Sequence, residues 1–133
     1  MALEAAVRYA HLYHVRVHVT VNTLVKPGEM QELRAALGEI AASGADAVIV
    51  QDLGVAALVR RMAPGLSLHA STQMSIHNLA GVEAAAEMGI TRAVLARELS
   101  LDQIRFISQH ASIETEVFVQ GALCFCHSGQ CYM

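Results

Sequence analysis

The chain has 133 residues, which suits one domain over 1–133, and its hydrophobic content of 54% is enough for a sizeable core. Its net charge of −3 is spread without a basic stripe, which argues against tight binding to phosphates but leaves RNA open as a substrate. No segment reaches the roughly 18 apolar residues of a membrane span, and the start does not have the pattern of a signal peptide. We therefore expect a cytoplasmic protein without a membrane partner.

Valine-rich segments with the pattern of strands alternate along the chain with segments of helical spacing. The first strand is predicted over Val15 to Asn22 (VRVHVTVN), and a helix follows over Glu29 to Gly44, ended by its glycine. Four more strands are predicted at 45–52, 66–71, 91–96 and 115–121, and three more helices at 54–65, 78–89 and 100–111. Ser100 and Gln103 fit a capping box at the start of the last helix.

These strand–helix repeats predict an α/β fold with a parallel sheet. Strand starts recur roughly every 20 to 30 residues, the span of one βα unit, and the strands are apolar runs of the kind buried on both faces. About five such units fit either an open doubly wound sheet or part of an eight-stranded barrel. No glycine-rich phosphate loop follows the first strand, which weakens the nucleotide-binding version. The pattern alone leaves both architectures open.

Polar side chains gather where the predicted strands end, and ligands bind at the carboxyl ends of parallel strands in both architectures. The candidates for substrate binding are Asn22, Asp52, Ser71 and Thr72, and the candidates for catalysis are His69, Gln73, Arg97 and Glu98. Simpler roles are open for several of them. Asn22, Asp52 and Gln73 fit caps or loops, and Arg97 with Glu98 fits an ordinary ion pair.

All three cysteines lie within the last ten residues, at Cys124, Cys126 and Cys131. In a cytoplasmic protein such a cluster is more often a set of metal ligands or reactive thiols than of disulfides. Converging thiolates suit zinc or an iron–sulfur cluster. A nucleophile with His127 or His69 as its base is a second option, and small buried hydrophobic side chains are a third. The spacing alone does not decide among the three.

The segment EVFVQGALCFCHSGQCYM, residues 116–133, resembles the signature of the collagenase-like peptidase family, peptidase family U32. The matching positions are Glu116, Phe118, Gly121, Ala122, Leu123, Cys124, Ser128, Gly129 and Cys131. The stretches VHVTVNTL, GADAVIVQD, LHASTQMSIHN and AVLARELSLDQI resemble successive strand ends of that family, in order. The resemblance therefore covers nearly the whole chain, with departures at Cys126, His127 and in QDLG.

The resemblance implies a TIM-barrel-like catalytic domain, of which this chain supplies part, and a peptidase of unknown catalytic type acting on peptides. The alternative that it implies is oxygen-independent hydroxylation of RNA or of a quinone. Family members of that kind hold a 4Fe–4S cluster on four cysteines, and Cys124 and Cys131 fall on the first two of those positions. We then expect the other two ligands beyond residue 133, so that the chain is an internal fragment of a longer protein.

Two classes of function follow. In an enzyme, Arg97 holds a substrate carboxylate or phosphate through its planar fork, and Glu98 or His69 moves protons. The sequence has neither a serine elbow nor HExxH, so proteolysis would draw on a pair such as Cys124 with His69. In a non-catalytic truncated domain, little iron and no turnover are expected.

Open strand edges give a further expectation. An incomplete barrel leaves edge strands that can pair with another chain. We therefore expect self-association through Val15 to Val21 and through Val117 to Val119, measurable as the mass of the isolated chain in light scattering.

Overall fold

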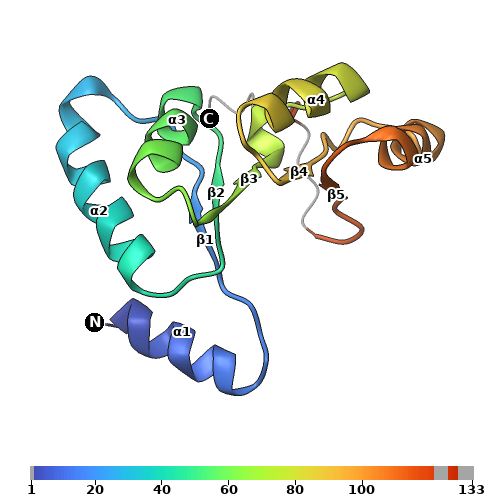
Figure 1. Ribbon diagram of the computed structural model, residues 1–133. Helices are drawn as coiled ribbons and strands as arrows, with labels where there is room; N and C mark the ends of the chain where they lie inside the picture. Colours follow the sequence, from blue (N-terminus) through green and yellow to red (C-terminus); the bar gives the residue numbers. More distant parts are fainter. Residues whose placement is uncertain (1, 122–125, 129–133) are drawn as a thin grey trace. The chain divides into compact units, whose positions relative to one another are not determined.

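A computed structural model describes residues 2–121 and 126–128, in which helices and parallel strands alternate (Figure 1). The helices are α1 (Ala2–Leu12), α2 (Met30–Ala42), α3 (Leu53–Met62), α4 (Leu79–Glu87) and α5 (Leu101–His110), with the short 3-10 helices η1 (Pro27–Glu29) and η2 (Thr72–Met74). The strands are β1 (His18–Val21), β2 (Ala47–Val50), β3 (Ser67–Ala70), β4 (Arg92–Val94) and β5 (Glu114–Glu116). This alternation confirms the α/β prediction of about five strand–helix units.

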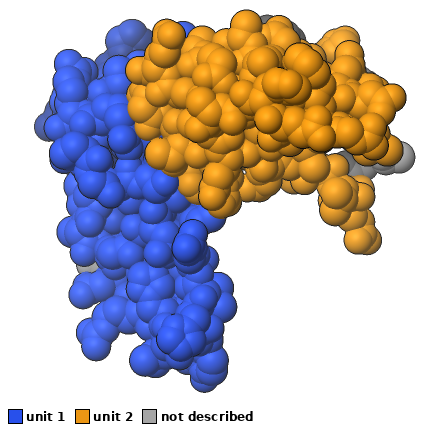
Figure 2. Space-filling model, turned by 45° about the vertical axis from the view of Figure 1, so that its right-hand side comes forward, with its two compact units in different colours: residues 1–68 blue, residues 69–133 orange. Residues whose placement is uncertain are grey.

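The chain divides into two compact units, residues 1–68 and 69–133, with the boundary inside β3 (Figure 2). In the first unit β1 pairs in parallel with β2, with Val19 opposite Val48. In the second unit β4 pairs in parallel with β3 on one side and with β5 on the other. Strand order follows chain order in each unit, as expected of successive βα units, and the carboxyl ends of β1 to β4 each lead into a connection that contains a helix.

Each unit has its own apolar core, which explains why the strands are continuous apolar runs. In the first unit the largest fully buried side chains are Val7, Leu37, Val48, Val50, Val55, Leu58 and Val59. In the second unit fully buried apolar side chains include Val82, Ile90 and Leu95, from α4 and from the ends of β4. Leu68, on β3 at the boundary, is also fully buried.

The fifth strand is shorter than predicted. The expected strand over 115–121 was drawn from the alternation in TEVFVQG, whereas β5 ends at Glu116. Its partner β4 ends at Val94, and the backbone N–H of Leu95 makes a last bond to the Glu116 carbonyl at 2.8 Å. The ladder therefore runs out before Phe118 and Val119, which are exposed. The predicted edge strand at Val117 to Val119 is wrong in this structure, and self-association stays a prediction.

The first helix, α1, was not predicted. Glu4 lies in its first turn and His11 in its last turn. Acidic residues at the start of a helix and basic residues at its end interact favourably with the helix dipole. Val7 is its buried residue, and His11 Nε2 lies 2.9 Å from Oδ2 of Asp46, the residue directly before β2. Asp46 also accepts from the Val17 backbone N–H at 2.7 Å. The His11 and Val17 contacts lower the pKa of Asp46 below its ordinary value.

Two glycines around α2 predict stability changes of opposite sign. Gly44 follows the helix with φ +81°, as the predicted C-terminal stop requires, so Gly44→Ala should lower the free energy of unfolding by about 1–2 kcal/mol. Gly38 lies inside α2 with open space around an added Cβ, so Gly38→Ala should raise it by about 0.5–1 kcal/mol. Urea unfolding of both variants measures the difference. Equal shifts in the same direction would contradict the backbone argument.

Candidate functional site

The connection after β3 turns sharply and presents hydroxyl and imidazole groups. Ser71 is buried and caps η2, since its hydroxyl accepts from the Gln73 backbone N–H at 3.2 Å. Ser75 closes η2 in the left-handed region, with φ 56°, which is uncommon for a residue with a Cβ. His77 Nδ1 lies 2.6 Å from the Ser75 carbonyl oxygen. Because a carbonyl oxygen only accepts, Nδ1 carries a proton, and Nε2 is the nitrogen left to face the site.

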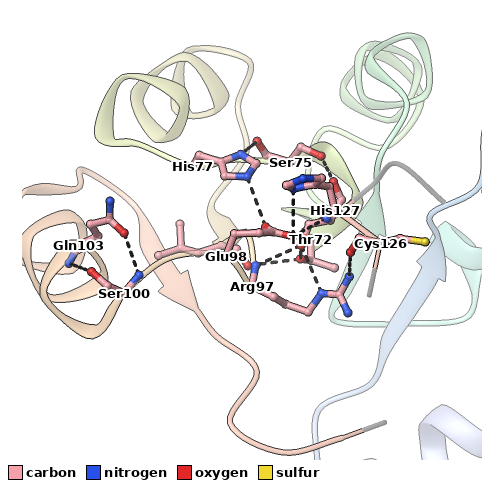
Figure 3. A network of polar contacts seen from close by, with 11 residues as sticks. Thr72, Ser75, His77, Arg97, Glu98, Ser100, Gln103, Cys126 and His127 are labelled. Carbon is pink, nitrogen blue, oxygen red and sulfur yellow. Dashed lines mark hydrogen bonds and ion pairs between the residues drawn. The ribbon is translucent and has the colours of Figure 1, made fainter. Parts of the chain in front are cut away.

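The backbone that leaves β4 is bonded directly to this connection. The Ala96 backbone N–H donates to the Ile76 carbonyl at 3.0 Å, and the Thr72 hydroxyl donates to the Leu95 carbonyl at 3.3 Å. These contacts join the carboxyl ends of two neighbouring strands. The two residues after Ala96, which the sequence nominates as catalytic, are thereby brought beside the β3 connection (Figure 3).

Ser128 links both connections to the signature segment. It is 0% exposed, and each of its three polar groups has a partner. Its Oγ lies 3.1 Å from the backbone nitrogen and 3.3 Å from Nε of Arg97, and 3.3 Å from Thr72 Oγ1. Its backbone N–H donates to Glu98 Oε1 at 2.7 Å, and its carbonyl accepts from the Ser75 hydroxyl. Ser128 is therefore the centre of a network that ties residue 128 to positions 30 to 56 residues away.

The hydroxyl of Thr72 is the donor to two acceptors in this network. It donates to the Leu95 carbonyl and to Ser128 Oγ, each at 3.3 Å. Ser128 Oγ also accepts from the backbone N–H and from the Nε–H of Arg97. A buried network of linked hydrogen bonds favours a single arrangement of the backbone.

The Glu98 carboxylate is the charged member of the network. Its side chain is 28% exposed, with Oε2 3.3 Å from His77 Nε2 and Oε1 3.8 Å from Nδ1 of the exposed His127 (Figure 3). Burial acts to raise the pKa of Glu98, but hydrogen bonds from Ser128 and from its own backbone, with the charge of His77, outweigh it. The pKa of Glu98 therefore lies below its ordinary value, and the carboxylate is ionised at neutral pH.

Arg97 is directed at the signature segment. Besides the two bonds from its backbone nitrogen and Nε to Ser128, its Nη2 donates to the Cys126 carbonyl at 3.2 Å. The guanidinium thus holds two residues of the segment, on either side of His127. Arg97 and Glu98 do not contact each other in the simple ion pair that the sequence left open; both charges engage residues 126–128.

The structure brings three of the predicted site residues together and adds others. Thr72, Arg97 and Glu98 meet around Ser128. Sequence reasoning did not nominate Ser75, His77 or Ser128 for the site, although Ser128 stood in the family signature and His77 in the stretch LHASTQMSIHN. Those two quoted stretches were the available signal, but only the tertiary contacts show that they meet.

The other predicted residues have local structural partners or positions. His69 is buried on β3, opposite Arg92 in the ladder to β4. Gln73 is half-buried in η2, and its Oε1 lies 3.5 Å from the Ser71 hydroxyl. In the first unit, Asn22 follows β1, and Asp52 caps α3 by accepting from the backbone N–H groups of residues 54 and 55 at 2.7 and 3.1 Å. The cap is the simpler role left open for Asp52, and the predicted catalytic and substrate-binding roles stay predictions.

The predicted metal ligands Cys124 and Cys131 lie outside the described residues. Within 2–121 and 126–128, no three side chains of histidine, cysteine, aspartate or glutamate are grouped so that they could hold a metal ion. In the same part of the chain, no helix combines the length and the apolarity that crossing a membrane requires.

The family model described as peptidase family U32 matches residues 1–133, the whole chain. The chain belongs to peptidase family U32. The resemblance carried by the signature segment and the strand ends is thereby confirmed. A solved structure of the U32 peptidase Mk0906 superimposes with a TM-score of 0.72 over 86% of this chain and 50% of that one, at 17% identity, which shows that the fold is shared.

Curated U32 relatives carry names of two kinds. The chain is 41% identical over 127 residues to the 23S rRNA 5-hydroxycytidine C2501 synthase of Escherichia coli, and 36% identical over 132 residues to the tRNA hydroxylation protein P of the same organism. It is 33% identical over 136 residues to an uncharacterized protease of Methanocaldococcus jannaschii. These matches cover 96%, 98% and 98% of this chain but only 19%, 29% and 33% of the relatives. The names favour the hydroxylation alternative over the peptidase reading.

Proposed function

We propose that this U32 chain is part of an enzyme that hydroxylates bases in ribosomal or transfer RNA in the cytoplasm. The observation that carries the proposal is the 41% identity, over 96% of the chain, to a protein named for making 5-hydroxycytidine in 23S rRNA. The tRNA hydroxylation protein points to the same substrate class. The net charge of −3 predicts that this chain adds little to the binding of RNA phosphates.

We propose further that Cys124 and Cys131 supply two thiolates to a 4Fe–4S cluster. Thiolates are the usual ligands of such clusters, so the donor set of the signature segment fits the group. Residues 126–128, which lie between the two cysteines in the sequence, are held at the ends of β3 and β4 by Arg97 and Glu98. When bound, the cluster supplies one-electron transfer. On this proposal the residues of this chain hold its ligand segment at the rim where substrates of such folds bind.

The test is made in Escherichia coli that lacks its own 23S rRNA 5-hydroxycytidine synthase. We expect the gene that encodes this chain to restore a hydroxylated nucleoside to rRNA, or to add one to tRNA, detected by mass spectrometry of digested RNA. The same gene with Cys124→Ser should restore none. RNA that stays unmodified while the protein accumulates in soluble form would contradict the proposal.

Proteolysis is the second candidate, because the words peptidase or protease stand in the family description and in the names of the Methanocaldococcus relative and of the superimposed structure. The same purified protein is assayed on collagen-like peptides. Cleavage that Cys124→Ser abolishes, together with unmodified RNA, would favour the thiol-dependent peptidase over the hydroxylase.

A further inference from the structure

Hydrogen bonds from two strand-end connections of the second unit meet on residues 126–128 of the signature segment. Thr72, Ser75, Arg97, Glu98 and Ser128 form what we call the Ser128 latch. Its members come from the connection after β3, from the end of β4 and from the segment itself. These contacts join residues 30 to 56 positions apart, so they close long loops of the chain. Closing a loop costs conformational entropy, which the contacts of the latch must offset.

We propose that Ser128 and Glu98 are positioning residues, which fix residues 126–128 on the ends of β3 and β4 so that the thiols of the segment are presented for metal binding. This inference rests on the proposed function for its metal-binding half. It changes the role of Glu98 from a predicted proton carrier to a holder of the ligand segment. Arg97, predicted to bind substrate, acts in the same way through the Cys126 carbonyl.

The burial of Ser128 supports a positioning role. A serine with 0% exposure must satisfy its polar groups inside the protein, and here the hydroxyl, the N–H and the carbonyl each have partners. Removing one partner leaves a buried polar group unmatched, so the position tolerates little change. Cys124 and Cys131 stand four and three residues from Ser128 in the sequence.

The charge of Glu98 supports the same role. An ionised carboxylate that accepts a backbone N–H at 2.7 Å forms a charge-assisted bond, roughly twice as strong as a neutral one. The bond from Nδ1 to the Ser75 carbonyl fixes the His77 ring, and its Nε2 then lies 3.3 Å from Oε2 of Glu98. The groups that face this carboxylate are thus His77, His127 and the Ser128 N–H.

The second unit contains a matched control. Glu83 of α4 accepts from the backbone N–H of Ser112 at 2.9 Å and from its hydroxyl at 2.6 Å. This pair has the same chemistry as Glu98 with Ser128, but Ser112 is exposed, Glu83 is half-buried, and neither residue is a member of the Ser128 latch. Ser112→Ala and Glu83→Gln therefore report what losing a serine–glutamate contact does by itself.

Two readouts test the latch in the full-length protein. In the metal-free protein, hydrogen exchange at the Ser128 amide should be about 10- to 100-fold faster in Ser128→Ala and Glu98→Gln than in the parent. In protein loaded without oxygen, a chelator competition should show iron affinity lower by about 10- to 100-fold in the same variants, as for other residues that orient metal ligands. Ser112→Ala and Glu83→Gln should change neither quantity.

Rescue separates positioning from general stability. Thr72→Val removes the hydroxyl that meets Ser128, while Thr72→Ser keeps it. We expect Thr72→Val to lower the iron affinity and to alter the electron paramagnetic resonance spectrum of the reduced cluster. Thr72→Ser should keep the iron affinity and the spectrum of the parent protein. Unchanged exchange in Ser128→Ala overturns the latch. Faster exchange with unchanged iron affinity overturns its role toward the metal, and a parent that binds no iron overturns the metal-binding half together with the proposed cluster.

Discussion

Replacement of Cys124 by serine is expected to reduce the iron and acid-labile sulfide of protein purified without oxygen to background. A serine hydroxyl stays protonated at neutral pH, whereas a thiolate is the ligand that iron–sulfur clusters use. A cluster that loses one of its ligands also loses the closed coordination that protects it. The measurement is the iron and sulfide content per chain, together with the visible absorption of the cluster.

Cys126→Ser is the matched control for this experiment. Cys126 lies two residues from Cys124, and its main-chain carbonyl, not its thiol, is the group that Arg97 holds. We expect Cys126→Ser to keep its iron and sulfide. Full occupancy in Cys124→Ser, or loss of the cluster in Cys126→Ser alone, would show that the ligands were assigned to the wrong cysteines.

Leu68→Ala is expected to lower the free energy of unfolding by about 2–5 kcal/mol, the range for a buried leucine cut back to alanine. Leu68 is 0% exposed and lies on β3, the strand whose carboxyl end leads into the connection that carries Thr72. The loss combines the transfer free energy of the removed atoms with the cavity that they leave. Urea unfolding followed by circular dichroism measures it.

Leu101→Ala provides the comparison for Leu68→Ala. Leu101 is 78% exposed at the first position of α5, so its truncation should change the free energy of unfolding by no more than about 0.5 kcal/mol. Similar losses in both variants would mean that β3 is not part of a packed core. Such a result would also remove the support for the connection that carries Thr72.

The Ser128 latch gives the family signature a physical meaning. In the sequence the signature is a pattern of spacing around cysteines. In the structure its serine is buried, Arg97 bonds to its hydroxyl, and Glu98 accepts from its backbone N–H. Three of the polar residues at the strand ends, Thr72, Arg97 and Glu98, therefore bond to the segment, and on our proposal they position it.

Local signals in the sequence were sufficient for most of the fold. In the described part of the chain, the alternation of apolar runs and helical spacing predicted the five strands and four of the five α-helices, because burial on both faces of a parallel strand requires continuous apolar residues. The glycine at position 44 and the capping box at Ser100 were read correctly, since both depend on neighbours a few residues away. The helix α1 and the end of β5 were missed. The length of β5 depends on where its partner β4 stops, which local sequence does not encode.

By itself the sequence determined the α/β class, the U32 family and the cysteines that are candidates for metal binding, because each of these is carried by composition, spacing or a contiguous motif. Only the tertiary structure decided which polar residues meet. Ser128 is 56 residues from Thr72 and 31 from Arg97, and a hydrogen bond depends on distances of about 3 Å that no local pattern specifies. The contacts of Arg97 and Glu98 with residues 126–128 are therefore visible only in the tertiary structure.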